Sequence, residues 1–377
     1  MLSDGLKYQD SRMATCEEMK QDLAPFALHD AAAKSKGGPV LLCDGDTVYT
    51  DPSDSHSLIV GDTGSMKTLR FVLPLIYSCA AADESMVIVD PKGELARKSE
   101  SFLSAKGYKT VIINMRDPQR SPDTWNPMGV IERAYKSGEE GQQKAVLQLN
   151  DMLNDIFFRR VDTKDPYWNE SAGQLALGIC LLLLALGEKL NMKNLLKWRY
   201  EKLADGTLDK CFRNLPTDGE IYQNLAGYLG MTAENTKSCI RSTFDQLVRV
   251  FKSAPALTEM LNDTSFDIER IGEAKAAVFV VIPDEKTTFH FLATLFISQC
   301  YTTLLETAER HGGSLPRRTN IILEEFCNLP ALGDIVPMIT AARSRNIRLH
   351  MVIQSYGQLV EKYGENVSRA ILDNCGN

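Results

Sequence analysis

A glycine-rich segment between a strand pattern and a helix pattern constrains the fold more than any other part of the chain. The segment Gly61-Asp-Thr-Gly-Ser-Met-Lys-Thr68 follows the apolar run Ser57–Val60 and opens a helical pattern over Thr68–Cys79. A phosphate-binding loop of the type G-x-x-x-x-G-K-[ST] requires this setting, because the loop amides and the helix N-terminus converge on phosphate oxygens. The residues that this loop predicts to bind nucleotide are Gly61, Asp62, Thr63, Gly64, Ser65, Met66, Lys67 and Thr68.

Two side chains of the loop carry the predicted chemistry. Lys67 would bring a positive charge to the β- and γ-phosphates of ATP, and the Thr68 hydroxyl would bind Mg²⁺. Met66 departs from the pattern, because glycine at that place lets the backbone approach phosphate and adopt unusual dihedral angles. The sequence leaves two alternatives: ordinary helical angles that point Met66 outward at little cost, or strain of roughly 1–3 kcal/mol with weaker nucleotide binding.

Strand and helix patterns alternate on both sides of a long helical stretch. Apolar strand patterns occur at residues 86–89, 109–113, 276–282, 320–323 and 348–353, with helical spacing between them. Alternation of this kind implies right-handed crossovers and a parallel sheet. Residues 129–268 instead carry apolar residues at three- and four-residue spacing almost throughout. We therefore expect an α/β fold with a parallel core sheet, interrupted by an inserted all-α domain.

Acidic residues end two of the predicted strands. Asp90 ends the run Val87–Val89, and Glu324 and Glu325 follow the run Ile321–Leu323. Acids at strand ends are often simply solvated, but beside a phosphate loop such carboxylates orient Mg²⁺ and activate the attacking water. The two groups together therefore favour a role in the nucleotide site.

Gln354 and two arginines are further candidates. Gln354 ends the last strand pattern, where it would sense the γ-phosphate or position water. Arg343 and Arg345, on the preceding helix, would reach the nucleotide of a neighbouring subunit and stabilise charge there. For either arginine alone, a solvated cation at a helix end is the simpler interpretation.

Composition narrows the alternatives. Of the 377 residues, 44% are hydrophobic, which is enough for a sizeable core. The formal net charge of −7 excludes an evenly basic surface for nucleic acid, but it does not exclude a local basic channel. None of the nine cysteines forms a C-x-x-C pair and no His or Cys cluster has zinc spacing, so neither a disulfide framework nor a structural metal is expected. The longest apolar run, Leu175–Leu186, is shorter than the about 20 residues of a membrane span and predicts a buried core helix.

Several short segments, taken in order, match those of one known family. Besides the phosphate loop they are Leu6-Lys-Tyr, Ala14-Thr-Cys-Glu-Glu-Met19, Asp90-Pro-Lys-Gly-Glu-Leu95, Trp125-Asn-Pro-Met128, Tyr167-Trp-Asn-Glu-Ser-Ala172, Leu323-Glu-Glu-Phe326 and Gln354-Ser-Tyr-Gly-Gln-Leu-Val-Glu-Lys-Tyr-Gly364. With these segments the chain resembles the type IV secretion coupling proteins, the TraG-like conjugative DNA transfer ATPases, along nearly its whole length.

The resemblance implies a RecA-like P-loop NTPase that uses ATP and Mg²⁺, usually assembled as a hexamer. Such proteins recruit a relaxase with its single-stranded DNA and deliver this substrate to secretion-channel components. By position, Lys67 and Thr68 would bind the phosphates and Mg²⁺. Glu324 would take the metal side of the second acidic motif, where aspartate is usual, and Glu325 would activate water. Arg343 matches the helix arginine expected to act across subunits.

The resemblance also predicts how the chain is divided. We expect a polar segment after a membrane anchor (1–38), a first nucleotide-binding part (39–128), an all-α insertion (129–268) and a second nucleotide-binding part (269–377). Family members carry N-terminal transmembrane helices, lie at the cytoplasmic side of the bacterial inner membrane and have a longer C-terminus. We therefore expect this chain, itself soluble, to be a truncated form whose last strands are missing and whose sheet has an uncovered edge.

Two other functions stay open at this point. Met66 and the expected truncation fit a nucleotide-degenerate receptor, in which the helical insertion binds relaxase or effector protein without turnover of ATP. A RecA-like DNA translocase of another family, such as a chromosome-partitioning motor, is disfavoured by the helical insertion that follows Trp125-Asn-Pro127.

Overall fold

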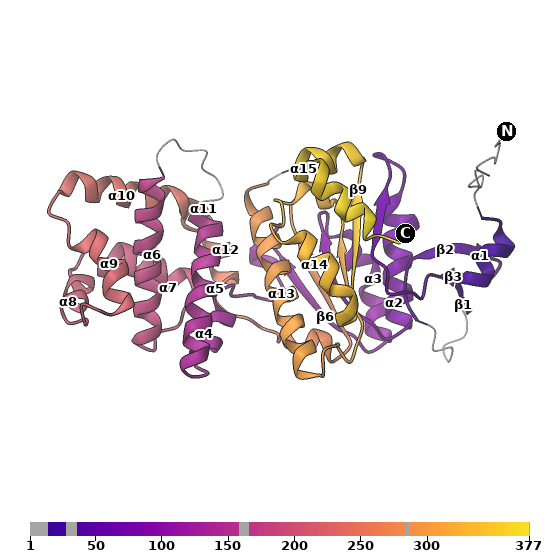
Figure 1. Ribbon diagram of the computed structural model, residues 1–377, viewed down its shortest axis with the longest axis horizontal. Helices are drawn as coiled ribbons and strands as arrows, with labels where there is room; N and C mark the ends of the chain where they lie inside the picture. Colours follow the sequence, from indigo (N-terminus) through magenta and orange to yellow (C-terminus); the bar gives the residue numbers. More distant parts are fainter. Residues whose placement is uncertain (1–13, 28–35, 158–165, 284, 286, 377) are drawn as a thin grey trace, which may run out of the picture.

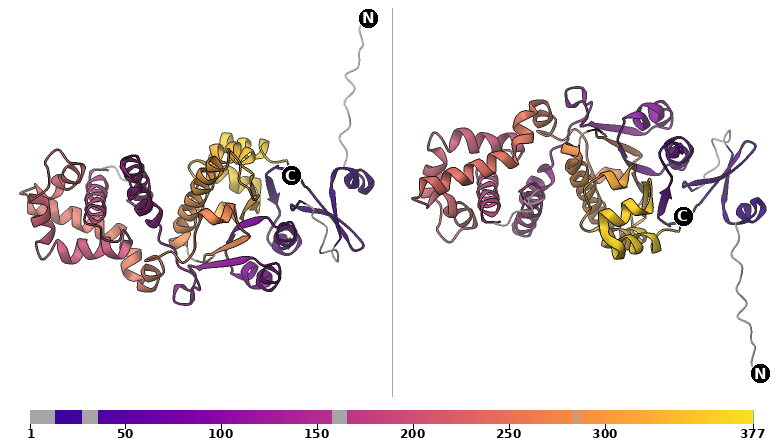
Figure 2. Two further views of the ribbon diagram at one scale, coloured as in Figure 1. Left: turned by 90° about the horizontal axis from the view of Figure 1, so that it is seen from below. Right: turned by 90° about the horizontal axis from the view of Figure 1, so that it is seen from above.

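The computed structural model describes residues 14–27, 36–157, 166–283, 285 and 287–376. They form three parts in a row along the long axis: a group of helices, a parallel sheet with helices on both faces, and a small antiparallel sheet (Figures 1 and 2). The segment Leu6-Lys-Tyr8, which contributes to the family resemblance, lies outside the described residues.

The core of the molecule is a six-stranded sheet of order β4-β9-β8-β5-β7-β6, in which every neighbouring pair is parallel. The strands are β4 (Ser57–Val60), β5 (Ser85–Asp90), β6 (Lys109–Asn114), β7 (Ala276–Val281), β8 (Thr319–Leu323) and β9 (Ile347–Ile353). Strands β5, β7, β8 and β9 are buried along their whole length, which explains why their sequences are largely continuous apolar runs. The parallel core sheet predicted from the sequence is confirmed.

Helices cover both faces of this sheet. On one face lie the π-helical turn Thr68–Val72, which continues into α2 (Leu73–Ala81), and α3 (Glu94–Ala105). On the other face lie α13 (His290–Arg310), α14 (Ile335–Ala342) and α15 (Tyr356–Asp373). Successive residues of a strand point to opposite faces, so Ile88 packs against α2 and α3 while Val87 packs on the side of α13. Short 3₁₀ turns occupy Pro118–Arg120, Glu269–Gly272, Thr287–Phe289, Phe326–Asn328 and Arg343–Arg345.

A small antiparallel sheet stands apart from the main one. It contains β1 (Ala24–Ala27), β2 (Val40–Asp44) and β3 (Thr47–Thr50) in the order β1-β3-β2, and α1 (Cys16–Asp22) precedes it. The sequence groups residues 39–128 together, whereas the structure pairs β3 with both β1 and β2. Among the described residues, none of these three strands pairs with the main sheet. The predicted boundary at residue 38 thus crosses this small sheet. The division into four parts stays a prediction.

The segment between β6 and β7 is helical. Its helices are α4 (Gly129–Tyr135), α5 (Glu139–Phe157), α6 (Tyr167–Ala185), α7 (Met192–Lys197) with the π-helical turn Trp198–Lys202, α8 (Thr207–Arg213), α9 (Glu220–Leu229), α10 (Glu234–Leu247), α11 (Arg249–Ser253) and α12 (Pro255–Met260). Among the described helices, α6 is long and apolar enough to cross a membrane, but 72% of its most apolar stretch is buried inside the protein. It is the core helix that the apolar run 175–186 predicts.

The chain passes between the main sheet and this helical part twice, and the two passages are hydrogen-bonded to each other. Trp125 N donates to Met260 O at 3.1 Å, and Ser265 N donates to Thr124 O at 3.1 Å. The Trp125 ring is fully buried and meets Phe296 of α13 edge-on, with 5.1 Å between ring centroids. The two passages therefore form one short double-stranded connection.

A buried polar network lies near the amino-terminal edge of the main sheet. Glu84 accepts hydrogen bonds from Arg348 Nη2 at 3.0 Å and from Asn320 Nδ2 at 2.9 Å. His350 Nε2 lies 3.1 Å from Asn320 Oδ1. The network also reaches the segment before β2, because Arg348 donates to Gly37 O at 2.9 Å and Glu84 accepts from Gly37 N at 3.0 Å. It therefore fastens the small sheet's connection to the main sheet.

Two buried histidines of this region predict a pH dependence of stability. Burial holds the pKa of His56 and of His350 below the usual value. Both take up protons on unfolding, so their contribution to stability is complete above about pH 6.5 and is lost as the pH falls further. We expect His350→Gln to make the slope of unfolding free energy against pH shallower by up to about 1.4 kcal/mol per pH unit between pH 6.5 and 5. Urea denaturation at a series of pH values measures this slope.

The matched control is His311→Gln, since His311 is an exposed histidine that lies 3.1 Å from Glu273. This variant should keep the slope of the parent protein. An unchanged slope in His350→Gln would show that its burial does not govern the acid side of the stability curve.

Candidate nucleotide-binding site

The glycine-rich loop joins the end of β4 to the helix that begins at Thr68. Gly61 N donates to Ile353 O at 3.2 Å, which fixes the start of the loop to the end of β9. A Cβ on Gly61 would lie 2.8 Å from Ser65 Oγ, so this position has no room for a side chain. Gly64 has a φ of 83°, a conformation that glycine adopts without strain. The backbone therefore explains Gly64, whereas the close approach of the Ser65 and Lys67 side chains explains Gly61.

Met66 adopts the left-handed conformation, with a φ of 60°. The Met66 carbonyl accepts a hydrogen bond from Arg70 N at 2.8 Å, which is the first bond of the helix that follows. Met66 as a whole is 53% exposed to solvent. A left-handed residue with a Cβ is strained by about 1–2 kcal/mol. Of the two alternatives that the sequence leaves, the structure has the strained one: the loop keeps the backbone that glycine would adopt.

The Lys67 ammonium is folded back onto its own loop. Lys67 Nζ donates to Gly61 O and, at 3.0 Å, to Asp62 O. Thr63 Oγ1 donates to Gln354 Oε1 at 3.3 Å, so the end of β9 contacts the loop through a side chain as well as through the backbone. The structure thus brings Gln354 to the loop, where the sequence predicts it.

Glu324 and Thr68 meet across the site. The Thr68 hydroxyl donates a hydrogen bond to Glu324 Oε1, and Glu324 is 8% exposed. Burial raises the pKa of Glu324 to about 7; the hydrogen bond from Thr68 opposes this shift, and the charges of Asp90, Glu325 and Glu94 reinforce it. The carboxyl group therefore lies next to the loop hydroxyl with which it is predicted to share a cation.

Asp90 lies behind the site and not in its wall. It is fully buried, and its Oδ2 accepts a hydrogen bond from Ala96 N at 3.0 Å at the start of α3. Burial raises the pKa of this carboxyl group. The structure therefore gives Asp90 a role in holding the turn after β5, whereas the sequence predicts that it binds nucleotide.

Glu325 stands at the edge of the site in a left-handed conformation, with a φ of 53°. Asn328 Nδ2 donates to Glu325 Oε2 at 2.6 Å, and Asn328 N donates to Glu325 O at 2.8 Å. The strained backbone and the two bonds hold the carboxylate beside Glu324. Strain of this kind is concentrated at functional sites.

Arg343 is not near the loop of its own chain. It lies before β9 and pairs with Asp54, which precedes β4, at 2.9 Å. The amino ends of parallel strands lie at the opposite edge of the sheet from the loop that follows β4. A role for Arg343 at a nucleotide would therefore require the site of another subunit, as the resemblance implies.

The loop, Glu324 and Gln354 surround a cavity of about 320 Å³. The lining residues are Thr63, Gly64, Met66, Lys67, Thr68, Leu69, Lys92, Glu94, Lys98, Glu324, Glu325, Val352, Ile353 and Gln354. Sequence reasoning missed Lys92, Glu94 and Lys98. Two of these, Lys92 and Glu94, belong to the segment Asp90-Pro-Lys-Gly-Glu-Leu95, and the match of this segment to the family was the signal that could have found them.

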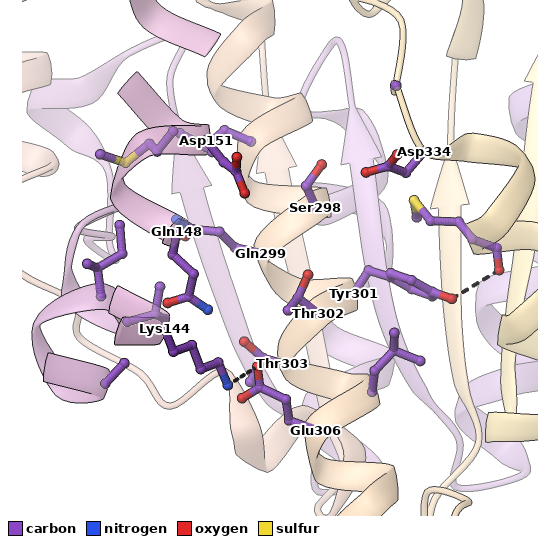
Figure 3. A pocket seen from close by; sticks show the side chains of 18 of the residues that line it. Lys144, Gln148, Asp151, Ser298, Gln299, Tyr301, Thr302, Thr303, Glu306 and Asp334 are labelled. Atoms are coloured by element: carbon purple, nitrogen blue, oxygen red, sulfur yellow. Dashed lines mark hydrogen bonds and ion pairs between the residues drawn. The ribbon is translucent and has the colours of Figure 1, made fainter. Parts of the chain in front are cut away.

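A larger cleft of about 980 Å³ lies elsewhere, between α4 and α5 on one side and α13 and α14 on the other (Figure 3). Lys144 of α5 and Glu306 of α13 form an ion pair across it at 2.6 Å. Asp151, Ser298 and Asp334 lie toward its other end (Figure 3). No residue of the phosphate loop lines this cleft, so it is distinct from the candidate site.

The residues around the smaller cavity suit a phosphate chain with a divalent cation. Lys67 and the N-terminus of the helix supply positive charge, and Thr68 and Glu324 supply the oxygen ligands that Mg²⁺ prefers. In the described part of the chain, no group of three or more His, Cys, Asp or Glu side chains could hold a metal ion. A cation here would therefore also need oxygen atoms from a phosphate or from water.

A family model for type IV secretory system conjugative DNA transfer matches residues 12–377. The chain is 23% identical to the conjugal transfer protein TraG of Rhizobium radiobacter over 349 residues, which are 90% of this chain and 51% of that protein. It is 22% identical to the conjugal transfer protein TraG of Agrobacterium fabrum over 349 residues, 90% of this chain and 50% of that one. The chain spans about half the length of the curated relatives it matches.

Solved structures of the conjugative coupling protein TrwB have a similar fold. The unbound monoclinic form has a TM-score of 0.61 at 19% identity and covers 92% of this chain and 72% of that one. The complex of TrwB with the non-hydrolysable ATP analogue ADPNP has a TM-score of 0.60 at 18% identity, with coverages of 94% and 78%. The complex with ADP and Mg²⁺ has a TM-score of 0.59 at 19% identity, with coverages of 91% and 72%. The likeness confirms the predicted α/β fold with a RecA-like parallel core.

Two substitutions at Met66 separate backbone strain from side-chain bulk. Met66→Gly and Met66→Ala both remove the thioether, but only glycine relieves the left-handed strain. We expect the glycine variant to be more stable than the alanine variant by about 1 kcal/mol, measured by urea denaturation.

The matched pair is Leu69→Gly and Leu69→Ala, because Leu69 is 55% exposed and lies inside the helical segment that follows the loop. There the order should reverse, with glycine less stable than alanine by about 1 kcal/mol. Equal stability of the two Met66 variants would contradict the strain that the backbone indicates.

Proposed function

Because this chain belongs to the type IV secretory system family of conjugative DNA transfer proteins, we propose that it is the motor part of an ATP-dependent coupling protein. The observation that carries the proposal is the cavity of about 320 Å³ shared by Lys67, Thr68 and Glu324. In this proposal, ATP hydrolysis drives the delivery of a relaxase with its single-stranded DNA to a secretion channel. The TrwB complexes with an ATP analogue and with ADP and Mg²⁺ support the choice of these ligands.

Lys67, Thr68 and Glu324 bind the phosphates and the cation in this proposal. Lys67 leaves the carbonyl oxygens of Gly61 and Asp62, to which it donates in the structure, and binds phosphate oxygens instead. Thr68 and Glu324, which share a hydrogen bond in the structure, would hold Mg²⁺. When bound, Mg²⁺ neutralises charge on the phosphate oxygens.

Glu325 and Gln354 act on the attacking water. Glu325, held by Asn328, takes a proton from this water as a general base. Gln354, which accepts a hydrogen bond from Thr63, orients the water and responds to the terminal phosphate. Both side chains line the cavity from the ends of neighbouring strands.

Arg343 stabilises charge on the nucleotide of a neighbouring subunit, in a ring that is a hexamer in the full-length protein. Its position at the opposite edge of the sheet, paired with Asp54, supports a role in trans. The helical part, residues 129–268, lies at the end of the molecule away from the small sheet (Figure 1) and would receive the relaxase. The full-length protein would lie at the cytoplasmic side of the inner membrane.

A second candidate is a nucleotide-degenerate receptor, in which the helical part binds the protein substrate and the loop does not turn over ATP. The left-handed Met66 favours this candidate, because it strains the loop and places a thioether at the cavity. The two candidates differ in one measurable property, the hydrolysis of ATP.

The test is ATP hydrolysis by the parent protein, by Met66→Gly and by Lys67→Ala. We expect the parent protein to hydrolyse ATP and single-stranded DNA to raise the rate. Met66→Gly should bind nucleotide more tightly than the parent protein, since it removes the thioether that lines the cavity. Lys67→Ala should lose hydrolysis. Absence of hydrolysis in both the parent and a folded Met66→Gly protein would exclude the motor and favour the receptor.

The proposed trans role of Arg343 has its own test. Arg343→Ala should lower kcat by about 10³-fold with little change in nucleotide affinity, because an arginine that acts across a subunit boundary stabilises the transition state. Arg345→Ala tests the other arginine that the sequence offers, which the family resemblance does not match, and should keep kcat. Mixing Arg343→Ala with Lys67→Ala protein should restore part of the activity, since mixed rings contain intact sites. No recovery on mixing would contradict action in trans.

A further inference from the structure

The segment Asp90-Pro-Lys-Gly-Glu94 contributes more to the cavity than the buried Asp90. We propose that Lys92 is a second phosphate-binding cation, which contacts the terminal phosphate of a bound nucleoside triphosphate. This inference rests on the proposed function, because it concerns the same cavity. Lys92 lines that cavity together with the phosphate loop, Glu324 and Glu325.

The backbone that carries Lys92 is held from several sides. Asp90 Oδ2 accepts from Ala96 N at 3.0 Å, and Gly93 N donates to Asp90 O at 3.3 Å, which closes the turn between β5 and α3. Gly93 has a φ of 67°, and a Cβ there would lie 3.3 Å from Val281 Cγ1 at the end of β7. The turn is therefore fixed against the sheet, and only the side chain of Lys92 is free to move.

The order of the strands places Lys92 near the terminal phosphate. The loop with Lys67 follows β4, the carboxylates Glu324 and Glu325 follow β8, and Lys92 follows β5, the strand on the far side of β8 from β4. A phosphate chain that starts in the loop and ends beside Glu325 and Gln354 has its terminal group near the end of β8, and Lys92 lines the same cavity from the neighbouring strand β5. The inner phosphates lie nearer to β4, so Lys92 contacts the last phosphate and not the first.

The pairing of charges singles out Lys92 among the lysines that line the cavity. Lys98 forms an ion pair with Glu94 at 2.8 Å, one turn away on α3. Lys67 donates to carbonyl oxygens of the loop. For Lys92, the described residues provide no ion pair, and its side chain is exposed. Three carboxylates line the cavity as well, so a polyanion needs positive charge beyond Lys67, and Lys92 supplies it without breaking an existing pair.

The decisive experiment compares a triphosphate with a diphosphate in the purified chain. Calorimetric titration with Mg²⁺ and either ADPNP or ADP gives two dissociation constants for each protein, and neither ligand is hydrolysed. Lys92→Met should weaken ADPNP binding by about 10-fold or more and ADP binding by less than about 3-fold, because one charge-assisted contact is lost with the terminal phosphate alone. Lys92→Arg should keep most of the parent protein's preference for ADPNP over ADP.

Lys109→Met is the matched control, because Lys109 is an exposed lysine that begins β6, at the edge of the sheet opposite the cavity, and does not line the cavity. It should change both constants by less than about 3-fold. Equal weakening of ADPNP and ADP in Lys92→Met, or no weakening, would overturn the assignment while leaving the nucleotide site in place. If neither the parent protein nor Met66→Gly binds either ligand, the proposed function fails and the role of Lys92 fails with it.

Discussion

The whole candidate site depends on the parallel alignment of four neighbouring strands. In a parallel sheet all carboxyl ends meet at one edge, and the strand register brings these ends to within about two residues of one another: Val60 is opposite Ile353, Leu323 is opposite Met351, and Val89 is opposite Leu323. The residues that follow each strand therefore meet without any long side chain having to reach. Because the strands are buried on both faces, a shift by one residue would exchange the side chains that pack against α2 and α3 with those that pack on the side of α13, and both sets of packing contacts would be lost.

Backbone strain marks the two sides of the cavity. Met66 and Glu325 both have left-handed backbones although neither is glycine, and each lies directly beside a residue proposed to bind phosphate or metal. The other described non-glycine residues with positive φ, Asp83 and Asn346, lie in turns at the opposite edge of the sheet. A fold tolerates such strain where the surrounding structure enforces it. At Met66 the loop has the left-handed backbone that suits glycine, although the residue is methionine.

The sequence patterns predicted the strands, the helices and the loop better than they predicted which side chains line the cavity. The loop, the buried strands and the acidic strand ends could be predicted, because each has a local signature in residue type and spacing. The sequence could not predict whether Asp90 or Lys92 faces the cavity, because this depends on the direction of the turn after β5. The close approach of Gly93 to Val281 sets that direction. Likewise, no local pattern shows that Arg343 pairs with Asp54, since the two are brought together only by the pairing of β4 with β9.

The double-stranded connection between the main sheet and the helical part has a mechanical consequence. A part of a protein that is joined by a single segment can rotate about individual backbone bonds. Two segments that are hydrogen-bonded to each other can rotate only together. Trp125, at the foot of this connection, is clamped against Phe296 of α13, a helix that covers the sheet. A small displacement of α13 is therefore transmitted to the helical part through both passages together, which is a stiffer linkage than a single chain segment provides.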